Sequence, residues 1–358
     1  MTEKRYAWQG AASLSALLAL SFGISFGSVW AGCSIGTRLW SICNVVLGLT
    51  QWAMPALVCV AGSLFLASKR QIKLSVLWRT YVPSALISCA VWWMASSAVS
   101  MYNNHPQELD LLTFRECMAE TLEAPVFIGF CHMLVSFFIL YPLLHRIIHD
   151  EKLTLYGMIL IFAMSLLETT FRYIPYLSIL SLFTDQLNWG FYRAWAFYLL
   201  FGAWIADHEL RWETSLVIYV LGILATGAMI ALTSATTKFS PGYANEYIGY
   251  TSPLTGIQTA AVVVFFNRQL KNRHAPVFAH ATRNLWHCIP VLYVVSFFTD
   301  RLVSATNGST IPTAVLSALA NSAMGICIIL AFGKLPGFKK LVGEYQHKGG
   351  IKSWENGV

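Results

Sequence analysis

Long apolar blocks separated by short polar segments run through almost the whole chain. A helix that crosses a bilayer needs about 20 mostly apolar residues, and only a helix or a closed barrel satisfies its backbone groups there. The blocks are continuous instead of alternating every second residue, which favours helices over a transmembrane barrel. The pattern predicts an all-α, polytopic membrane helical bundle of about ten transmembrane helices, with approximate spans 12–32, 40–67, 80–101, 124–144, 154–172, 189–206, 214–234, 251–267, 285–300 and 311–333.

The basic residues indicate how these spans are oriented. Lys and Arg gather on the cytoplasmic side of membrane proteins. If the N-terminus is cytoplasmic, all the Lys and Arg of the chain lie on that side except Arg193, inside a span, and five in outer loops: Arg38, Arg115, Arg172, Lys238 and Arg301. The sequence therefore predicts cytoplasmic N and C termini, a single transmembrane domain over 1–333 and a short basic tail over 334–358.

Composition changes the picture in two ways. The chain is 56% hydrophobic and 11% charged, whereas soluble domains carry about 25% charged residues; a soluble protein is thereby excluded. The net charge of +7 lies in short clusters between apolar blocks, so it indicates topology and not nucleic-acid binding. No glycine-rich nucleotide loop and no Cys/His metal spacing occurs, and we expect no metal.

Charged residues inside the predicted spans are the first candidates for function, because each costs about 2.5–3.5 kcal/mol at mid-depth. Glu168 lies near the outer end of the fifth predicted span. Arg172 follows four residues later on the same helical face, and Arg193 enters the sixth span from the same side. These side chains predict either a substrate-facing polar site or a structural ion pair between two helices.

His132 lies in the outer half of the fourth predicted span, in GFCHMLVSFF. A neutral imidazole exchanges protons near pH 7, which makes His132 the best-placed candidate for a general base. The alternative is a buried histidine that is only hydrogen-bonded.

A basic rim is predicted at the cytoplasmic helix ends. Guanidinium groups match phosphate oxygens, so the rim could bind a nucleotide-like donor, although ordinary attraction to anionic lipid headgroups explains most of these residues. Arg79 and His287 are the exceptions, because each begins an apolar span.

The predicted outer segment 102–123 contains several acidic residues, among them Glu116 and Glu120. Paired carboxylates can catalyse glycosidic chemistry, but no rigid scaffold is evident to set their separation. We interpret this segment as a solvated acidic lid.

Several segments, taken in order, resemble the acyltransferase 3 family of integral membrane acyltransferases. They are NVVLGLTQWAMPALVCVAGSLFL from Asn44, WRTYVP with Arg79 and Pro83, the stretch from His132 to ILYPLLHRII, AFYLLFGAWIAD with Gly202, YTSPLTGIQTAAVVVFFNR, TRNLWHCIPVLYVV and ILAFGKLPGFKKLVG. Together they cover most of the chain. One departure is that family members usually carry a catalytic histidine in the first helix, whereas 6–34 contains none.

The resemblance implies a ten-helix fold and transfer of an acyl group, commonly acetyl from acetyl-CoA, to a sugar hydroxyl. It implies Arg79 near the donor and His132 near the reacting groups. Either His132 has replaced the first-helix histidine, or the chain binds without catalysing.

The sequence thus predicts an inner-membrane acyltransferase that modifies a cell-surface or lipid-linked glycan. His132 would be the base, Arg79 and His287 the donor-side groups, and Glu168, Arg172 and Arg193 the acceptor-binding groups. The expected partners are acyl-CoA, the glycan acceptor and membrane lipids, with acetyl-CoA as co-substrate, no permanently bound cofactor and no nucleic acid. The alternative is a non-catalytic membrane exporter of a glycan or a lipid-linked substrate.

Overall fold

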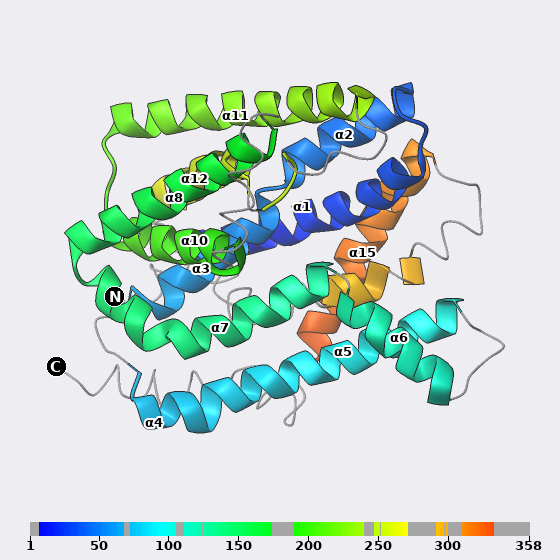
Figure 1. Cartoon of the computed structure of the whole chain (residues 1–358), viewed down its shortest axis with the longest axis horizontal. Coiled ribbons are helices and arrows are strands. Elements are labelled where there is room, and N and C mark those ends of the chain that lie inside the picture. Colours follow the sequence, from blue (N-terminus) through cyan, green and yellow to red (C-terminus); the bar gives the residue numbers. More distant parts are fainter. Residues whose placement is uncertain are drawn as a thin grey trace. The chain divides into compact units, whose positions relative to one another are not determined.

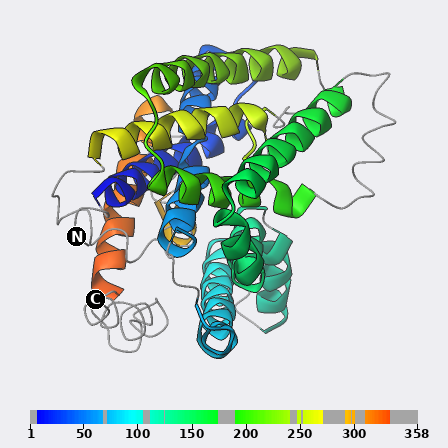
Figure 2. The same cartoon turned by 90° about the vertical axis from the view of Figure 1, so that its left-hand side faces the viewer.

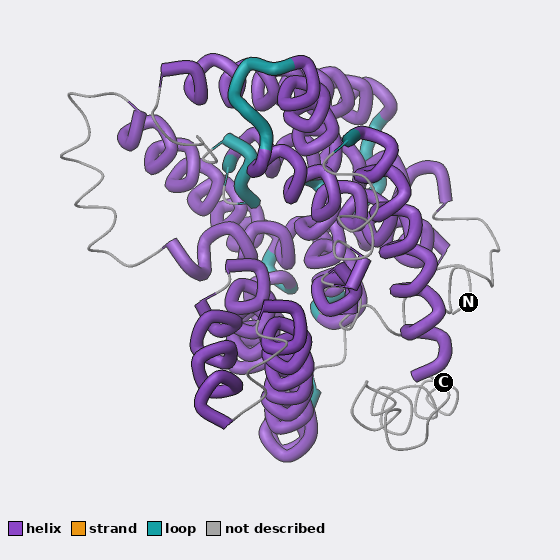
Figure 3. Tube along the Cα trace, turned by 90° about the vertical axis from the view of Figure 1, so that its right-hand side faces the viewer, coloured by secondary structure: helices purple, strands orange, loops and turns teal. Residues whose placement is uncertain are grey.

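The computed structural model is helical throughout the part of the chain that it describes. Among the described residues the helices are joined by short turns and no strand occurs (Figure 3). The prediction of an all-α fold is confirmed for the described residues. The described residues are 7–67, 72–104, 111–123, 125–173, 190–239, 247–250, 252–270, 291–296, 298–299 and 310–332.

The helices follow one another as shown in Figure 1. Their bounds are α1 (Ala7–Gly32), α2 (Arg38–Thr50), α3 (Ala53–Phe65), α4 (Leu74–Val76), a π-helical turn (Leu77–Tyr81), α5 (Val82–Asn104), α6 (Leu111–Glu123), α7 (Pro125–Ile148), α8 (Glu151–Tyr173), α10 (Gly190–Asp207), α11 (Trp212–Phe239), α12 (Pro253–Leu270) and α15 (Ile311–Phe332).

Five helical stretches are long and apolar enough to cross a membrane. They match the first, second, third, seventh and tenth predicted spans, so a membrane protein with several transmembrane helices is supported. Helices α7, α8, α10 and α12 fall on four more predicted spans, while the count of ten and the orientation of the termini stay predictions. The five stretches are Ala7–Gly32, Arg38–Phe65, Leu74–Tyr102, Trp212–Thr237 and Ile311–Ile328.

Proline interrupts the second span near its middle. Pro55 has no N–H to donate to the carbonyl of Gln51, four residues earlier, and its ring crowds that carbonyl. The helical bonding resumes with the N–H of Ala56, which donates to the Trp52 carbonyl over 2.9 Å. Helices α2 and α3 are therefore the two halves of one span, separated at Gln51 and Trp52.

A second proline accompanies the π-helical turn at the start of the third span. The N–H of Val82 donates to the Leu77 carbonyl, five residues back. Pro83, the next residue, cannot donate to the carbonyl of Arg79. Arg79 is exposed on this turn, and turns of this kind are frequent at functional sites.

The chain forms two compact units, which are described separately. In the first unit α1 packs on α2, α3 and α12, α3 packs on α10, and α11 lies along α12 (Figures 1 and 2). In the second unit α6 packs on α5. The first unit comprises 1–70, 143–282 and 309–315, and the second 71–142, 283–308 and 316–358.

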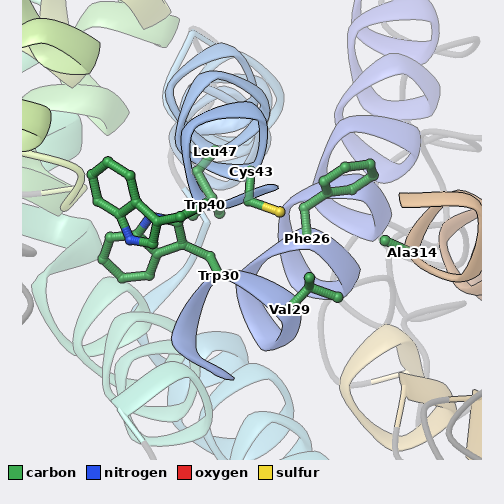
Figure 4. Packing of buried hydrophobic residues seen from close by; sticks show 7 residues of the cluster. All are labelled: Phe26, Val29, Trp30, Trp40, Cys43, Leu47 and Ala314. Carbon is green, nitrogen blue, oxygen red and sulfur yellow. The ribbon is translucent and has the colours of Figure 1, made fainter. Parts of the chain in front are cut away.

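Aromatic and small apolar side chains fill the contact between α1 and α2 (Figure 4). The rings of Trp30 and Trp40 stack with centroids 5.9 Å apart and an interplanar angle of 27°. Phe26 and Cys43 are buried beside them, and Ala314 contributes from the start of α15. Stacked aromatic pairs add about 0.5–1.5 kcal/mol beyond the area they bury, so this cluster stabilises the first unit.

Two glycines let α3 and α10 approach unusually closely. A Cβ built on Gly62 would overlap the backbone of Leu199, and one built on Gly202 would overlap the backbone of Cys59. Small residues permit such backbone contact between membrane helices, where dispersion and hydrogen bonds replace the hydrophobic effect. Gly62 and Gly202 come from two of the segments on which the family resemblance rests, and packing explains both.

The described residues of the acidic outer segment, 102–104 and 111–123, are helical. Its second half forms α6, and the indole N–H of Trp93 on α5 donates to the Met118 carbonyl over 2.9 Å. Cys117 is buried, whereas Glu116 and Glu120 are exposed. The carboxylates thus occupy the exposed side of a helix that is packed on its neighbour.

Candidate functional site

The predicted outer polar site lies on helices whose backbones are described at these positions but whose side chains there are not. His132 is on α7, Glu168 and Arg172 are on α8, and Arg193 is on α10. Helix α8 continues through Tyr173, so the four-residue spacing of Glu168 and Arg172 does fall on one helix. The pairing of their side chains stays a prediction.

Helices α8 and α10 pack on each other within the first unit. Phe162 and Phe197 meet with ring centroids 6.0 Å apart, about one and a half turns from Glu168 on α8 and about one turn from Arg193 on α10. This contact brings the two helices together. The predicted site would lie at least one helical turn away from it along both helices. His132 belongs to the second unit, so no distance connects it to Glu168 or Arg193.

The two predicted donor-side residues differ in what the structure provides. Arg79 is exposed on the π-helical turn of the second unit. His287 lies outside the described residues. The structure therefore positions one guanidinium at the start of a candidate span and leaves the donor role as a prediction.

Uncharged polar side chains connect three helices in the interior of the first unit. The Gln258 side-chain amide on α12 donates to the carbonyl of Gly48 on α2 over 2.8 Å and to the hydroxyl of Thr226 on α11 over 3.0 Å. The amide of Asn44, one turn before Gly48, donates to the Ile230 carbonyl on α11 over 3.1 Å. These residues, here called the amide cluster, hold α2, α11 and α12 together by hydrogen bonds.

The acceptor oxygens of the amide cluster are buried and have no hydrogen-bond donor among the described residues. Neither Asn44 Oδ1 nor Gln258 Oε1 has a hydrogen-bond donor among the described residues, although the side chains are only 1% and 4% exposed. A buried amide oxygen without a hydrogen bond costs about 1–3 kcal/mol. Both oxygens can accept hydrogen bonds from a hydroxyl group or from water.

The same feature recurs between α1 and α3. The Gln9 amide donates to the Ser63 hydroxyl over 3.4 Å, and Gln9 Oε1 is likewise buried without a donor in the described part of the chain. These amides carry no charge, so a search of the predicted spans for charged residues does not find them. The available signal was position, since Gln258 lies near the middle of the predicted span 251–267, whereas its other carboxamide, Asn267, lies at the end.

A polar pocket of about 270 Å³ lies where α10 ends, α11 begins and α12 ends. Arg268 Nη1 donates to the Ser215 hydroxyl over 3.1 Å and to the Leu210 carbonyl over 3.5 Å. Its guanidinium also lies over the ring of Trp212, 4.7 Å from the centroid. The lining residues are Ile205, Glu209, Leu210, Ser215, Val264, Asn267 and Arg268.

Neighbouring polar contacts fix the end of α10 near this pocket. The Asn267 amide donates to the Ile205 carbonyl over 3.2 Å. His208 stacks on Trp204 with centroids 4.6 Å apart, and its Nε2 lies 3.5 Å from a carboxylate oxygen of Glu151 at the start of α8. In the part of the chain that the structure describes, no group of three or more His, Cys, Asp or Glu is arranged to hold a metal ion.

No protein-family model, curated protein or solved structure matches the chain. The likeness to acyltransferase 3 segments stays a prediction from the sequence. Of the quoted segments, that beginning at Asn44 forms the second half of α2 and all of α3, AFYLLFGAWIAD lies on α10, and most of YTSPLTGIQTAAVVVFFNR lies on α12. These three segments all belong to the first unit. Two of them contain the amide-cluster residues Asn44 and Gln258.

Proposed function

We propose that the protein is a membrane acyltransferase that moves a short acyl group, such as acetyl, from acyl-CoA to a hydroxyl of a cell-surface or lipid-linked glycan. The ordered likeness of its segments to acyltransferase 3 proteins supports the reaction type. The inner membrane of a bacterium is the proposed location, and acyl-CoA is consumed as a co-substrate.

The observation that carries the proposal is the pair of buried amide oxygens in the first unit. A glycan presents many hydroxyl groups, each of which can donate one hydrogen bond. Asn44 Oδ1 and Gln258 Oε1 are acceptors held by amide groups that already bond to backbone carbonyls. A hydroxyl group that donates to either oxygen would satisfy it without bringing a charge into the bilayer.

The chemistry assigns a task to each predicted residue. A hydroxyl is a weak nucleophile at neutral pH, so His132 would accept its proton as the oxygen attacks the thioester carbonyl. The new C–O bond forms, the C–S bond breaks, and the imidazolium returns the proton to the leaving CoA thiolate. Arg79 and His287 would bind the phosphates of the donor, and Glu168, Arg172 and Arg193 would orient the acceptor.

Acetyl transfer by purified protein tests this proposal. The protein is reconstituted in liposomes with radiolabelled acetyl-CoA and a polysaccharide acceptor, and label in the glycan is measured. General-base catalysis contributes about 10²–10⁴-fold, so His132→Ala should lower the rate at least 100-fold. His149→Ala is the matched control, because His149 is an exposed histidine one residue past the end of α7, the helix that carries His132. It should retain activity within about twofold. Equal rates for both variants would contradict the role of His132.

A second candidate function is export of a glycan or a lipid-linked substrate. The interruption of the Arg38–Phe65 span at Gln51 and Trp52 favours it, since discontinuous helices line the substrate sites of many transporters. The same liposomes distinguish the two. Movement of labelled glycan across the membrane without acetyl transfer would identify the exporter and exclude the acyltransferase.

A further inference from the structure

The polar pocket at the end of α10, α11 and α12 lies where a membrane span begins. Trp212 starts a candidate span that runs to Thr237, and the residue is 53% exposed. Tryptophan is enriched at the boundary between lipid and water. The pocket beside Trp212 is thereby placed at the level of the lipid headgroups.

Arg268 offers hydrogen-bond donors in this pocket. A guanidinium carries five N–H donors in a planar fork, and both hydrogen bonds of Arg268 come from Nη1. Within the described residues, Nη2 and Nε have no acceptor. Arg268 is exposed, its guanidinium contacts the Trp212 ring and the Ser215 hydroxyl, and its remaining donors can bind the oxygens of a phosphate.

Glu209 gives the pocket a second charge of opposite sign. Arg268 would attract the phosphate of a ligand, and the Glu209 carboxylate would attract a cationic group. A headgroup with a phosphate and a primary ammonium complements both side chains at once. Charge complementarity therefore favours a zwitterionic aminophospholipid over an anionic lipid or a free phosphate.

The exposed face of α11 provides a surface for the acyl chains of such a lipid. Leu216, Val217, Val220 and Leu221 are large apolar residues that are each about half exposed, and they continue along the helix from Trp212. A pocket of about 270 Å³ lies just below the roughly 300–1,000 Å³ typical of drug-sized ligands. It suits a headgroup and leaves the chains outside on α11.

We propose that this pocket binds the headgroup of a zwitterionic aminophospholipid, such as phosphatidylethanolamine, with the phosphate on Arg268 and the ammonium on Glu209. The proposal concerns a lipid site and does not depend on acyl transfer. It also gives a reason for an exposed tryptophan and an arginine to be held together at the start of a membrane span.

Native mass spectrometry of the purified full-length protein tests the lipid site. The protein, delipidated in detergent, is titrated separately with phosphatidylethanolamine, phosphatidylglycerol and phosphatidylcholine of identical chains. We expect the wild-type protein to bind phosphatidylethanolamine at least about fivefold more tightly than either other lipid, which corresponds to about 1 kcal/mol. Equal or tighter binding of phosphatidylglycerol, or no lipid bound, would overturn the proposal without any variant.

Two pairs of variants test the individual contacts. Arg268→Gln should weaken phosphatidylethanolamine binding about tenfold or more, whereas Arg211→Gln, the same change at an exposed arginine outside the pocket lining, should leave it unchanged. Glu209→Gln should abolish the preference for phosphatidylethanolamine over phosphatidylglycerol, and Glu213→Gln should preserve it.

The outcomes separate a lipid site from a structural role. If Arg268→Gln fails to fold, as judged by circular dichroism, Arg268→Lys keeps the charge and should retain the preference with weaker binding. Soluble phosphoethanolamine should compete with the lipid if the headgroup alone is recognised. Binding that is unaffected in all pocket variants would show that the lipid binds elsewhere and refute the proposal.

Discussion

The contact between α3 and α10 makes a strong prediction for Gly202→Ala. The added Cβ would overlap the carbonyl group and Cα of Cys59. These are backbone atoms inside a helix, so no side-chain rotation can relieve the overlap and the two helices must separate. Overpacking in a core costs about 1–3 kcal/mol, and we expect the upper part of this range because the obstruction is rigid.

The measured consequence should be a lower melting temperature. One kcal/mol corresponds to about 2–4 °C for chains of 150–250 residues, so a drop of roughly 5 °C is expected for this longer protein. Tryptophan fluorescence of the purified protein in detergent would follow the transition. Gly227→Ala on α11 is the matched control, because a Cβ there meets nothing within 4 Å and alanine has the higher helix propensity.

Two results would refute this reasoning. If Gly202→Ala melts within about 1 °C of wild type, the close approach of α3 and α10 does not contribute to stability. If Gly227→Ala is equally destabilised, the loss reflects glycine replacement in general and not the contact. Gly62→Ala offers an independent check, since its Cβ would overlap the Leu199 backbone from the other side of the same interface.

Three further predictions follow from other contacts. Gln258→Leu should lower the free energy of unfolding, measured by SDS titration, by less than about 1 kcal/mol, because the loss of two interhelical hydrogen bonds is partly offset by removal of an amide oxygen that has no donor among the described residues. A loss above about 2 kcal/mol would contradict this reasoning. Burial, with a further contribution from the charge of Glu120, raises the pKa of the Cys117 thiol, so a smaller fraction of Cys117 than of an ordinary cysteine is thiolate at pH 7.4. Mass spectrometry should therefore find Cys117 alkylated more slowly than the half-buried Cys33, and faster as the pH rises toward 9; equal rates would contradict the burial. If the C-terminus is cytoplasmic, as predicted, alkaline phosphatase fused after Val358 should be inactive in cells. An active fusion would place the C-terminus outside.

The apolar pattern was enough to predict where most helices lie. The predicted span 12–32 corresponds to α1, and 214–234 lies within α11, because a helix buried in lipid needs a continuous apolar run whatever its neighbours are. The interruption at Pro55 was not predicted. An apolar window averages over one residue, whereas the loss of one N–H acts on one carbonyl four residues earlier.

The sequence was less informative about the candidate sites than about the helices. Ranking by charge directed attention to Glu168 and Arg193, whose side chains are not described, and passed over Asn44 and Gln258. An amide counts little in a hydropathy average, yet its buried oxygen must find a donor. Whether two amides meet depends on which helices are neighbours, and one sequence does not determine that.

Arg268 illustrates the same point at the membrane surface. In the sequence Arg268 is one of many positive charges on the predicted cytoplasmic side, and the charge asymmetry requires no partner for it. In the structure its guanidinium contacts Trp212 and Ser215 of a different helix. These contacts restrict the positions of its hydrogen-bond donors. A freely moving arginine would attract any anionic lipid, whereas a fixed one beside Glu209 can discriminate between headgroups. Selectivity for phosphatidylethanolamine is thus the property that separates a built site from ordinary positive charge at the membrane surface.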